Sequence, residues 1–372
     1  MNAYVKRDLY LNRLIVRRDN GQIKAVTGPR RSGKSFLLDP IYKDYLLSKG
    51  VPEDNIIIIS FDIEDEDTPQ ELLDREKLKE YLYSRIASQT ENYYVFLDEI
   101  QEVDGFERIV NGLNKRQNVD VYVTGSNSKF LSSEINTIFR GRSDEVSVLP
   151  FTFREFCQDR QESVNDLWKE YYTYGGLPAL RKMPTAEQKT TYLQKLWKKT
   201  YLDDVVERHN VENREALEAI ADALCSSIGS LTNTTRITNT LGSVRKIKIT
   251  DDTVAKYIGY LEEAFLFNEA RRYNIKGKKY YENIKKYYSI DVGLRNARLN
   301  YRQLEQTHLM ENIIFNELLY RGYVVDVGVV EHRKMVDGKS EYKQYEVDFI
   351  ATDGNEKYYI QSAYEIETEE KR

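Results

Sequence analysis

The chain has 372 residues, a length that suggests two or three domains. Its 41% hydrophobic and 31% charged residues are ordinary for a globular protein, and a net charge of −5 means that any attraction to nucleic acid has to be local. No run reaches the roughly 18 apolar residues of a membrane span, and the first residues lack the apolar core of a signal peptide, so we expect a cytoplasmic protein without a membrane partner. Cys157 and Cys225 lack metal-type spacing and are expected to be ordinary thiols in a reducing compartment.

Residues 1–150 predict an α/β domain with the parallel sheet of a P-loop NTPase. Short β-rich apolar runs alternate there with helical segments, and the runs read IKAVTG, IIIISFD, YYVFLDE, VYVTGS and EVSVLP. Because parallel strands need crossover connections that are usually helical, this alternation is typical of a parallel sheet.

Residues 28–35 match the pattern G-x-x-x-x-G-K-[ST] between a predicted strand and a predicted helix. The glycines let the backbone wrap a phosphate, and N–H groups at the start of the helix face it. Lys34 is predicted to bridge the β- and γ-phosphates of ATP, and Ser35 to bind Mg²⁺. Arg30 and Arg31 either contact phosphates or anchor the loop on acidic neighbours. The predicted nucleotide-binding residues are Gly28, Pro29, Arg30, Arg31, Ser32, Gly33, Lys34, Ser35, Phe36 and, further along the chain, Ser126.

The apolar strand YYVFLDE ends in two acids. Asp98 is predicted to hold Mg²⁺ and Glu99 to act as the general base that polarises water. The next strand ends in small polar residues, so Ser126 and Asn127 either sense the γ-phosphate or form an ordinary polar loop. Arg142 is either an arginine finger that acts on a neighbouring subunit or a surface arginine.

Residues 151–211 are mostly helical, and the family resemblance described below implies that they form a lid over the nucleotide. Arg208 and His209 end this stretch, and His209 either lies near the nucleotide or has a structural part. Residues 212–300 fit a winged helix, with residues 236–241 as its second helix and residues 253–265 as its recognition-type helix. The following β-rich stretch has Lys-Gly-Lys at a hairpin tip and would form the wing.

The winged-helix region is locally basic, since residues 229–300 hold 14 Lys and Arg against 7 Asp and Glu. Such a surface suits the phosphates of duplex DNA, while the alternative is a module that binds protein. The predicted DNA contacts are Arg271, Arg272, Lys276, Lys278 and Lys279.

Residues 301–372 predict a small α/β domain like a restriction-type nuclease, which we expect to be incomplete and degenerate. Glu311 on a helix is followed by Glu346 and Asp348 on a strand. A nuclease of this type needs a further acid-x-Lys on the next strand, but the sequence there reads Gln361-x-Ala363. Glutamine is a poor metal ligand and the lysine is missing, so nuclease activity is disfavoured.

Several segments together resemble the bacterial and archaeal AAA-type ATPases that carry a C-terminal domain of unknown function. They are GPRRSGKS, YVFLDEIQEV, VYVTGSNSKFLS, YGGLP at 174–178, YLDDVVERH at 201–209, KYYSIDVGLRNA and ENIIFNELLYRGY. The resemblance covers nearly the whole chain. It implies an AAA- or STAND-like ATPase core, a helical lid, a winged helix and a degenerate nuclease-like domain.

The leading hypothesis is an ATP-dependent molecular switch that uses ATP and Mg²⁺. GTP is disfavoured because Asn114-Lys115-Arg116-Gln117 lacks the aspartate of a guanine-reading motif. The rival is a nucleic-acid-binding protein with a regulatory ATP site, and an ATP-gated nuclease is the least favoured. A homo-oligomer or a protein partner is compatible with each hypothesis.

Overall fold

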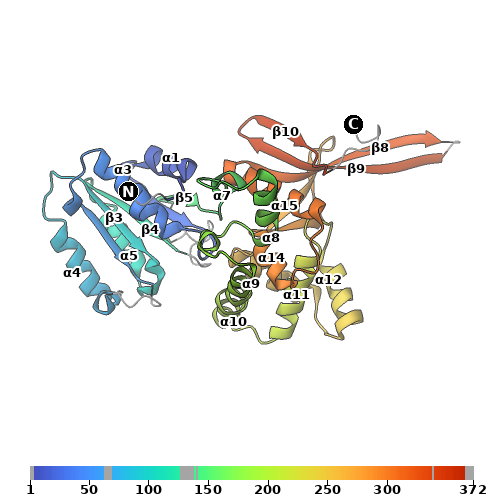
Figure 1. Cartoon of the computed structure of the whole chain (residues 1–372), viewed down its shortest axis with the longest axis horizontal. Helices are drawn as coiled ribbons and strands as arrows, with labels where there is room; N and C mark the ends of the chain where they lie inside the picture. The colour runs from blue at the N-terminus through green and yellow to red at the C-terminus, as the bar shows by residue number, and fades with distance from the viewer. Residues whose placement is uncertain (1–3, 63–68, 126–137, 140, 337–338, 365–372) are drawn as a thin grey trace. The chain divides into compact units, whose positions relative to one another are not determined.

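The computed structural model describes residues 4–62, 69–125, 138–139, 141–336 and 339–364 of the chain (Figure 1). Two compact units divide the chain, Met1–Leu149 and Pro150–Arg372. Among the described residues, no helix has both the length and the apolar character that crossing a membrane requires.

The first unit contains the predicted parallel sheet. Its strands are β1 (Ile23–Thr27), β2 (Ile56–Ser60), β3 (Tyr93–Asp98), β4 (Val119–Thr124) and β5 (Ser143–Ser147), in the spatial order β2-β3-β4-β1-β5. All neighbouring strands pair in parallel, which confirms the α/β fold. The helical segments are α1 (Asp8–Arg17), α2 (Lys34–Phe36), η1 (Leu37–Tyr42), α3 (Lys43–Ser48), η2 (Glu53–Asn55), η3 (Gln70–Leu73), α4 (Arg75–Arg85), η4 (Ile100–Glu102) and α5 (Phe106–Leu113).

A buried charged pair ties β1 to β4 in the middle of this sheet. Lys24 is fully buried and its ammonium group contacts Asp120. The Tyr122 hydroxyl donates to the other oxygen of Asp120 at 2.7 Å and lies 2.7 Å from the hydroxyl of Tyr42 in η1. Buried charges are tolerated when they are paired and hydrogen-bonded, so this network fixes the two strands that carry the site at their carboxyl ends.

The second unit begins with helices. They are α7 (Phe153–Phe156), α8 (Val164–Tyr174), η6 (Pro178–Lys182), α9 (Ala186–Lys195), η7 (Leu196–Leu202), α10 (Asp203–Arg208), α11 (Arg214–Ser226), α12 (Thr234–Thr240), η8 (Leu241–Arg245), α13 (Asp251–Glu263), α14 (Val292–Arg298) and α15 (Gln306–Arg321). One apolar core extends from Leu177 to Ala297 and includes the buried Trp197 and Cys225.

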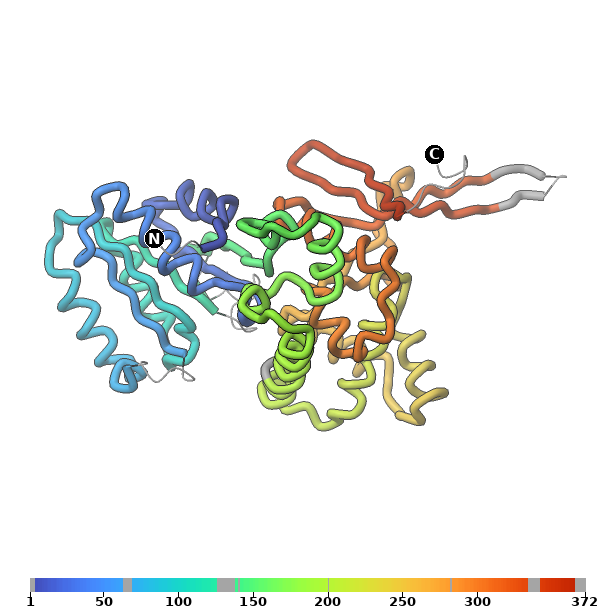
Figure 2. The backbone as a smooth tube through the Cα atoms, viewed as in Figure 1, coloured from blue at the N-terminus to red at the C-terminus, as the bar shows by residue number. Residues whose placement is uncertain are grey.

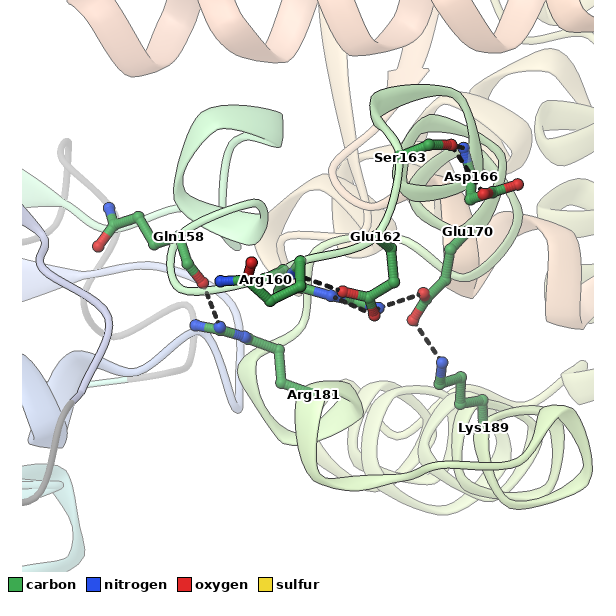
Figure 3. Close-up of polar contacts among 9 residues, drawn as sticks. Gln158, Arg160, Glu162, Ser163, Asp166, Glu170, Arg181 and Lys189 are labelled. Atoms are coloured by element: carbon green, nitrogen blue, oxygen red, sulfur yellow. Dashed lines mark hydrogen bonds and ion pairs between the residues drawn. The ribbon is translucent and has the colours of Figure 1, made fainter.

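The stretch predicted to be a lid is held together by a charged network (Figure 3). Glu170 of α8 accepts from Arg160 in the preceding loop at 2.6 Å and also contacts Lys189 of α9. Ser163 caps α8 through the N–H of Asp166 at 3.1 Å. Since Lys189 is 8% exposed, the loop, α8 and α9 are joined by a largely desolvated contact rather than by surface pairs alone. A lid function for this region stays a prediction.

A second sheet crosses the boundary that the sequence placed at residue 300. Its strands are β6 (Phe267–Asn274), β7 (Lys279–Ser289), β8 (Val324–Val336), β9 (Lys339–Asp353) and β10 (Glu356–Ile360), in the order β10-β9-β8-β6-β7. The hairpin β6–β7 has the predicted Lys-Gly-Lys in its turn and follows α11, α12 and α13, the element order on which the winged-helix prediction depends. Because β6 pairs in parallel with β8, however, this hairpin and the nuclease-like segment share one sheet.

Helix α15 packs on one face of this sheet, where Phe315 contacts the rings of Tyr288 and Phe349. Pairing between β8 and β9 continues to Val336 and Lys339, far past the three residue pairs that join β6 to β8. The two strands therefore run on as a hairpin beyond the rest of the sheet (Figure 2).

Three glycines and a buried aspartate join the end of α8 to the start of α14. Gly175 has φ +81°, and a Cβ there would lie 2.1 Å from Asp291 Oδ1. A Cβ on Gly293 would lie 1.8 Å from the carbonyl oxygen of Tyr174. Asp291 accepts from the N–H of Gly176 at 2.7 Å and caps α14. No larger residue fits at this junction, which accounts for the glycines of YGGLP and IDVGL.

The buried carboxyl of Asp291 predicts a pH-dependent contribution to stability. Burial raises its pKa to about 6, although backbone N–H donors favour the charged form. Because the folded state then binds the proton more tightly than the unfolded state, this contribution is present below about pH 4 and is lost as the pH rises through about 6. Relative to Asp291→Asn, the parent should lose up to about 3 kcal/mol of unfolding free energy over that range.

Urea unfolding of both proteins at pH 4, 5, 6 and 7.5 measures this difference. Taking the difference between the two proteins cancels the contribution of every group that titrates alike in both. A difference between parent and variant that stays constant with pH would contradict the assignment.

Candidate functional site

The loop after β1 depends on a glycine with an unusual conformation. Gly28 has φ +132°, and a Cβ there would lie 2.2 Å from the carbonyl oxygen of Val148. Val148 N–H donates to Thr27 at 2.8 Å, so β5 extends alongside the start of the loop. Gly33, with φ +93°, then precedes α2. Both positions favour glycine for backbone reasons, as the sequence motif predicts.

Lys34 and Ser32 give the loop the donors that a phosphate requires. Lys34 is buried, its Nζ lies 3.1 Å from the carbonyl oxygens of Gly28 and Pro29, and burial lowers its pKa. Ser32 Oγ is fully buried and has no hydrogen-bond partner within the described parts of the chain. Since phosphate oxygens are stronger acceptors than peptide carbonyls, these groups fit a nucleotide's phosphates.

Asp98, at the end of β3, connects three elements. Its Oδ1 accepts from Ser35 Oγ of α2 at 2.9 Å and also from Thr124 Oγ1 at the end of β4. Burial raises the pKa of Asp98, and the hydrogen bonds from Thr124 and Ser35 act in the opposite direction. A carboxylate and a serine hydroxyl in contact are the oxygen donors that Mg²⁺ prefers, so the two predicted metal ligands lie together.

Glu99 stands next to Asp98 in a strained backbone conformation. Its φ is +50°, which is uncommon for a residue with a side chain and is often found at functional sites. Its N–H donates to Thr124 Oγ1 at 2.9 Å, and its carboxylate accepts a hydrogen bond from Gln101, which is buried. The predicted general base is thus held at the same edge of the sheet as Ser35 and Asp98.

Sequence reasoning missed three residues of this site. Thr124 and Gln101 lie within segments that the motifs include, but no role was predicted for either. Arg7 lies outside every motif; it is 3% exposed and donates to the carbonyl oxygens of Ser32 at 3.0 Å and Leu149 at 2.8 Å. It therefore ties the loop to the end of the first unit. A polar residue that closes the strand beside β3 was the signal for Thr124, whereas nothing in the local sequence marks Arg7.

The remaining predicted residues differ in their placement. Ser126 and Asn127 lie outside the described residues. Phe36 is 47% exposed and its ring meets that of Tyr4 edge to face. Arg31, with φ +64°, is exposed on the loop and Arg30 is half-buried, so both roles suggested for them stay open.

Arg142 lies at the opposite edge of the sheet from the loop. Its carbonyl oxygen accepts from Ile23 N–H at 2.8 Å, at the amino end of β1, whereas the phosphate-binding loop follows the carboxyl end. A five-residue strand separates the two by roughly 16 Å. This position does not favour action of Arg142 on the nucleotide of its own subunit. Its role as an arginine finger that acts on a neighbouring subunit stays a prediction.

His209 packs within the helical part of the second unit. Its ring stacks on Tyr260 of α13 with centroids 3.7 Å apart, and Nε2 lies 3.2 Å from Glu263. Burial lowers its pKa, as does the neighbouring Arg208. These contacts favour the structural interpretation, and a place near the nucleotide stays a prediction.

The nuclease-like carboxylates are engaged by a lysine from another strand. Lys286 of β7 is 3% exposed, and its Nζ lies 2.9 Å from Glu311 of α15 and 2.7 Å from Glu346 of β9. Tyr288 also donates to Glu311 at 2.6 Å. Burial alone would lower the pKa of Lys286, but the two carboxylates outweigh it and raise the pKa, so the group stays an ammonium ion.

Asp348 and Gln361 form a separate group. The Asp348 carboxylate accepts from the N–H and the hydroxyl of Ser362, each at 2.7 Å, while Gln361 accepts from the N–H of Asp348 at 3.4 Å. Within the described residues, no cluster of three His, Cys, Asp or Glu side chains has an arrangement that could hold a metal ion. The four residues that suggested a nuclease are thus split into two groups that are satisfied by other partners.

Replacement of Lys286 should be costly because it leaves two carboxylates without their cation. We expect Lys286→Met to lower the unfolding free energy by about 3–5 kcal/mol, the usual cost of breaking a buried pair. The matched control is Lys285→Met, whose partner Glu269 is 2.6 Å away while both side chains are 31% exposed. That change should cost about 1 kcal/mol or less. Urea unfolding of the two variants measures both values, and equal small losses would contradict a buried charged network.

The five predicted DNA contacts do not share one environment, and the prediction for Arg272 is wrong. Arg272 is 6% exposed and donates to Gln344 of β9 at 3.3 Å, because alternate residues of β6 face α15. The other four, Arg271, Lys276, Lys278 and Lys279, are exposed.

Two family models match successive parts of the chain. The family model described as "AAA domain" matches residues 20–157, and one described as "Domain of unknown function (DUF8612)" matches residues 165–305. An uncharacterized protein of Haemophilus influenzae is 36% identical over 98% of this chain and 88% of its own length. One from Methanocaldococcus jannaschii is 29% identical over 94% and 77%. Among solved structures, the Aeropyrum pernix ORC1 protein in complex with DNA is similar over 81% of this chain and 94% of its own, with 14% identity and a TM-score of 0.34.

Proposed function

Because the chain belongs to the AAA-type P-loop ATPases that carry a second domain of unknown function, we propose that it hydrolyses ATP as a molecular switch. The observation that carries this proposal is the contact of Asp98 with Ser35 and Thr124, with Glu99 directly beside it. The phosphate-binding loop, the metal ligands and the proposed base thereby meet at one edge of one sheet.

Each residue has a distinct part in the proposed reaction. Lys34 and the loop N–H groups hold the β- and γ-phosphates, and Ser35 and Asp98 hold Mg²⁺. When bound, Mg²⁺ neutralises charge on the phosphates. Glu99 accepts a proton from the attacking water. Gln101 orients Glu99 by donating to its carboxylate, and the Thr124 hydroxyl orients it by accepting from its backbone N–H. Changes in these contacts during the cycle of ATP binding and hydrolysis would then alter the conformation of residues 150–372.

Two substitutions separate binding from turnover. Glu99→Gln removes the proposed base with little change in shape, so we expect ATP turnover to fall by at least about 100-fold while nucleotide binding persists. Lys34→Ala removes the phosphate-binding cation, so both binding and turnover should be lost. Phosphate release measures turnover, and titration with a fluorescent ATP analogue measures binding.

Glu80→Gln serves as the matched control, since Glu80 is an exposed glutamate of α4, outside the segments that form the site. It should keep the parent's turnover. Parent-like turnover in Glu99→Gln would remove the general-base assignment, and parent-like binding in Lys34→Ala would remove the phosphate site.

Nucleic acid is a candidate partner of the switch, and the exposed cations around the β6–β7 turn favour it. Helix α13, however, carries Asp251, Asp252, Glu262 and Glu263 against Lys256, which disfavours its entry into a DNA groove. We therefore expect duplex DNA to stimulate ATP turnover less than twofold. The measurement is the phosphate-release assay at low and moderate salt, and strong, salt-sensitive stimulation would instead favour the predicted binding of duplex DNA by the winged-helix region.

A further inference from the structure

The second sheet has one face that α15 covers and one that it does not. Ala270, Val327 and Phe349 are buried against α15. Successive residues of a strand point to opposite faces, so Arg271, Asp326 and their register partners point the other way. We call the outer part of this opposite side the open face, defined by Arg271, Tyr273, Tyr280, Asp326, Tyr345, Ile350, Lys357 and Tyr359.

Four tyrosines lie on the open face and come from four strands. Tyr273 pairs with Tyr280 between β6 and β7, and their ring centroids are 5.1 Å apart. Tyr345 of β9 pairs with Val330 of β8, and Tyr359 of β10 pairs with Ile350 of β9. Tyr280, Tyr345 and Tyr359 are 42%, 54% and 56% exposed. These exposed rings present flat aromatic surfaces to a ligand.

Cations lie among these rings. The Arg271 guanidinium is 4.2 Å from the centroid of the Tyr280 ring, and Lys357 Nζ is 5.5 Å from that of Tyr273. Both cations are exposed. The carboxylate of Asp326 is instead largely buried and accepts from the Tyr280 hydroxyl at 3.0 Å. The accessible charge of the open face is therefore positive, although the whole chain carries −5.

We propose that the open face binds single-stranded nucleic acid. Exposed rings on a sheet can stack on unpaired bases, and cations between the rings can contact the phosphates that link those bases. In a duplex the bases are already stacked on one another, so the tyrosines would have no ring surface to meet. Lys276, Lys278 and Lys279 in and beside the β6–β7 turn extend the positive surface from Tyr280.

This inference deepens the proposed function because it names the partner of the switch and places the contact on the sheet rather than on α13. Binding is measured without nucleotide, so ATP turnover has no part in the result. Failure of the binding test leaves the ATPase proposal standing, and loss of ATP turnover leaves the binding result standing.

The test uses the full chain and fluorescein-labelled 20-nucleotide single strands of DNA and RNA of one mixed sequence. Fluorescence anisotropy at low salt gives the affinity for each strand and for the DNA strand annealed to its complement. We expect the parent to bind single strands at least about tenfold more tightly than the duplex, and the affinity to fall with added salt.

Neighbouring tyrosines of β10 provide the matched pair. Tyr359→Ala should weaken single-strand binding by about 5- to 100-fold, the usual effect of losing one stacked base. Tyr358 is 45% exposed but points to the other side, where its ring lies 5.8 Å from that of Tyr323, so Tyr358→Ala should bind like the parent. Tyr359→Phe keeps the ring and should restore most of the affinity.

Three results would overturn the proposal. They are no single-strand binding at low salt, equal affinity for single strand and duplex, and equal losses in Tyr358→Ala and Tyr359→Ala. If single strands do not bind while Tyr359→Ala converts an oligomer to a smaller species in size-exclusion chromatography, the open face is instead an interface between copies of this chain.

Discussion

The hydrogen bonds that Asp98 accepts are the constraint on which the nucleotide site depends. They join the ends of β3 and β4 to the first turn after the phosphate-binding loop. Parallel strands bring their carboxyl ends to the same edge, so three segments that are distant in sequence meet there without any long excursion of the chain. The buried pair of Lys24 and Asp120 joins β1 to β4, and Arg7 holds the phosphate-binding loop by donating to the carbonyl oxygen of Ser32.

The sequence was most informative where function needs consecutive residues. The loop from Gly28 to Ser35 requires its glycines and lysine at set positions, so its pattern alone predicted its place and geometry. Asp98 and Glu99 were predictable because they end an apolar strand. Arg7 and Lys286 were not, since each acts on residues from other elements and its neighbours in sequence give no sign of this. The family and the α/β fold are shown, while the domain boundaries and the roles of Ser126, Asn127 and Arg142 stay predictions.

The basic stretch around residue 272 shows how a composition argument loses information. Arg271 and Arg272 are adjacent and chemically identical, yet strand alternation exposes one and buries the other. Lys285 and Lys286 differ in the same way, with one in a half-exposed pair and the other between two carboxylates. Local charge indicated a binding surface, but only the register of the sheet shows which cations belong to it and that tyrosines accompany them.

The junction of Gly175, Asp291 and Gly293 has a consequence for combining this chain with its relatives. Two segments more than a hundred residues apart approach so closely that neither tolerates an added methyl group, and the carboxylate of one caps the backbone of the other. A hybrid that takes α8 from one protein and α14 from another takes one half of this contact from each parent. Recombination points between the two segments are therefore safe only when both parents share the same glycines and the same aspartate.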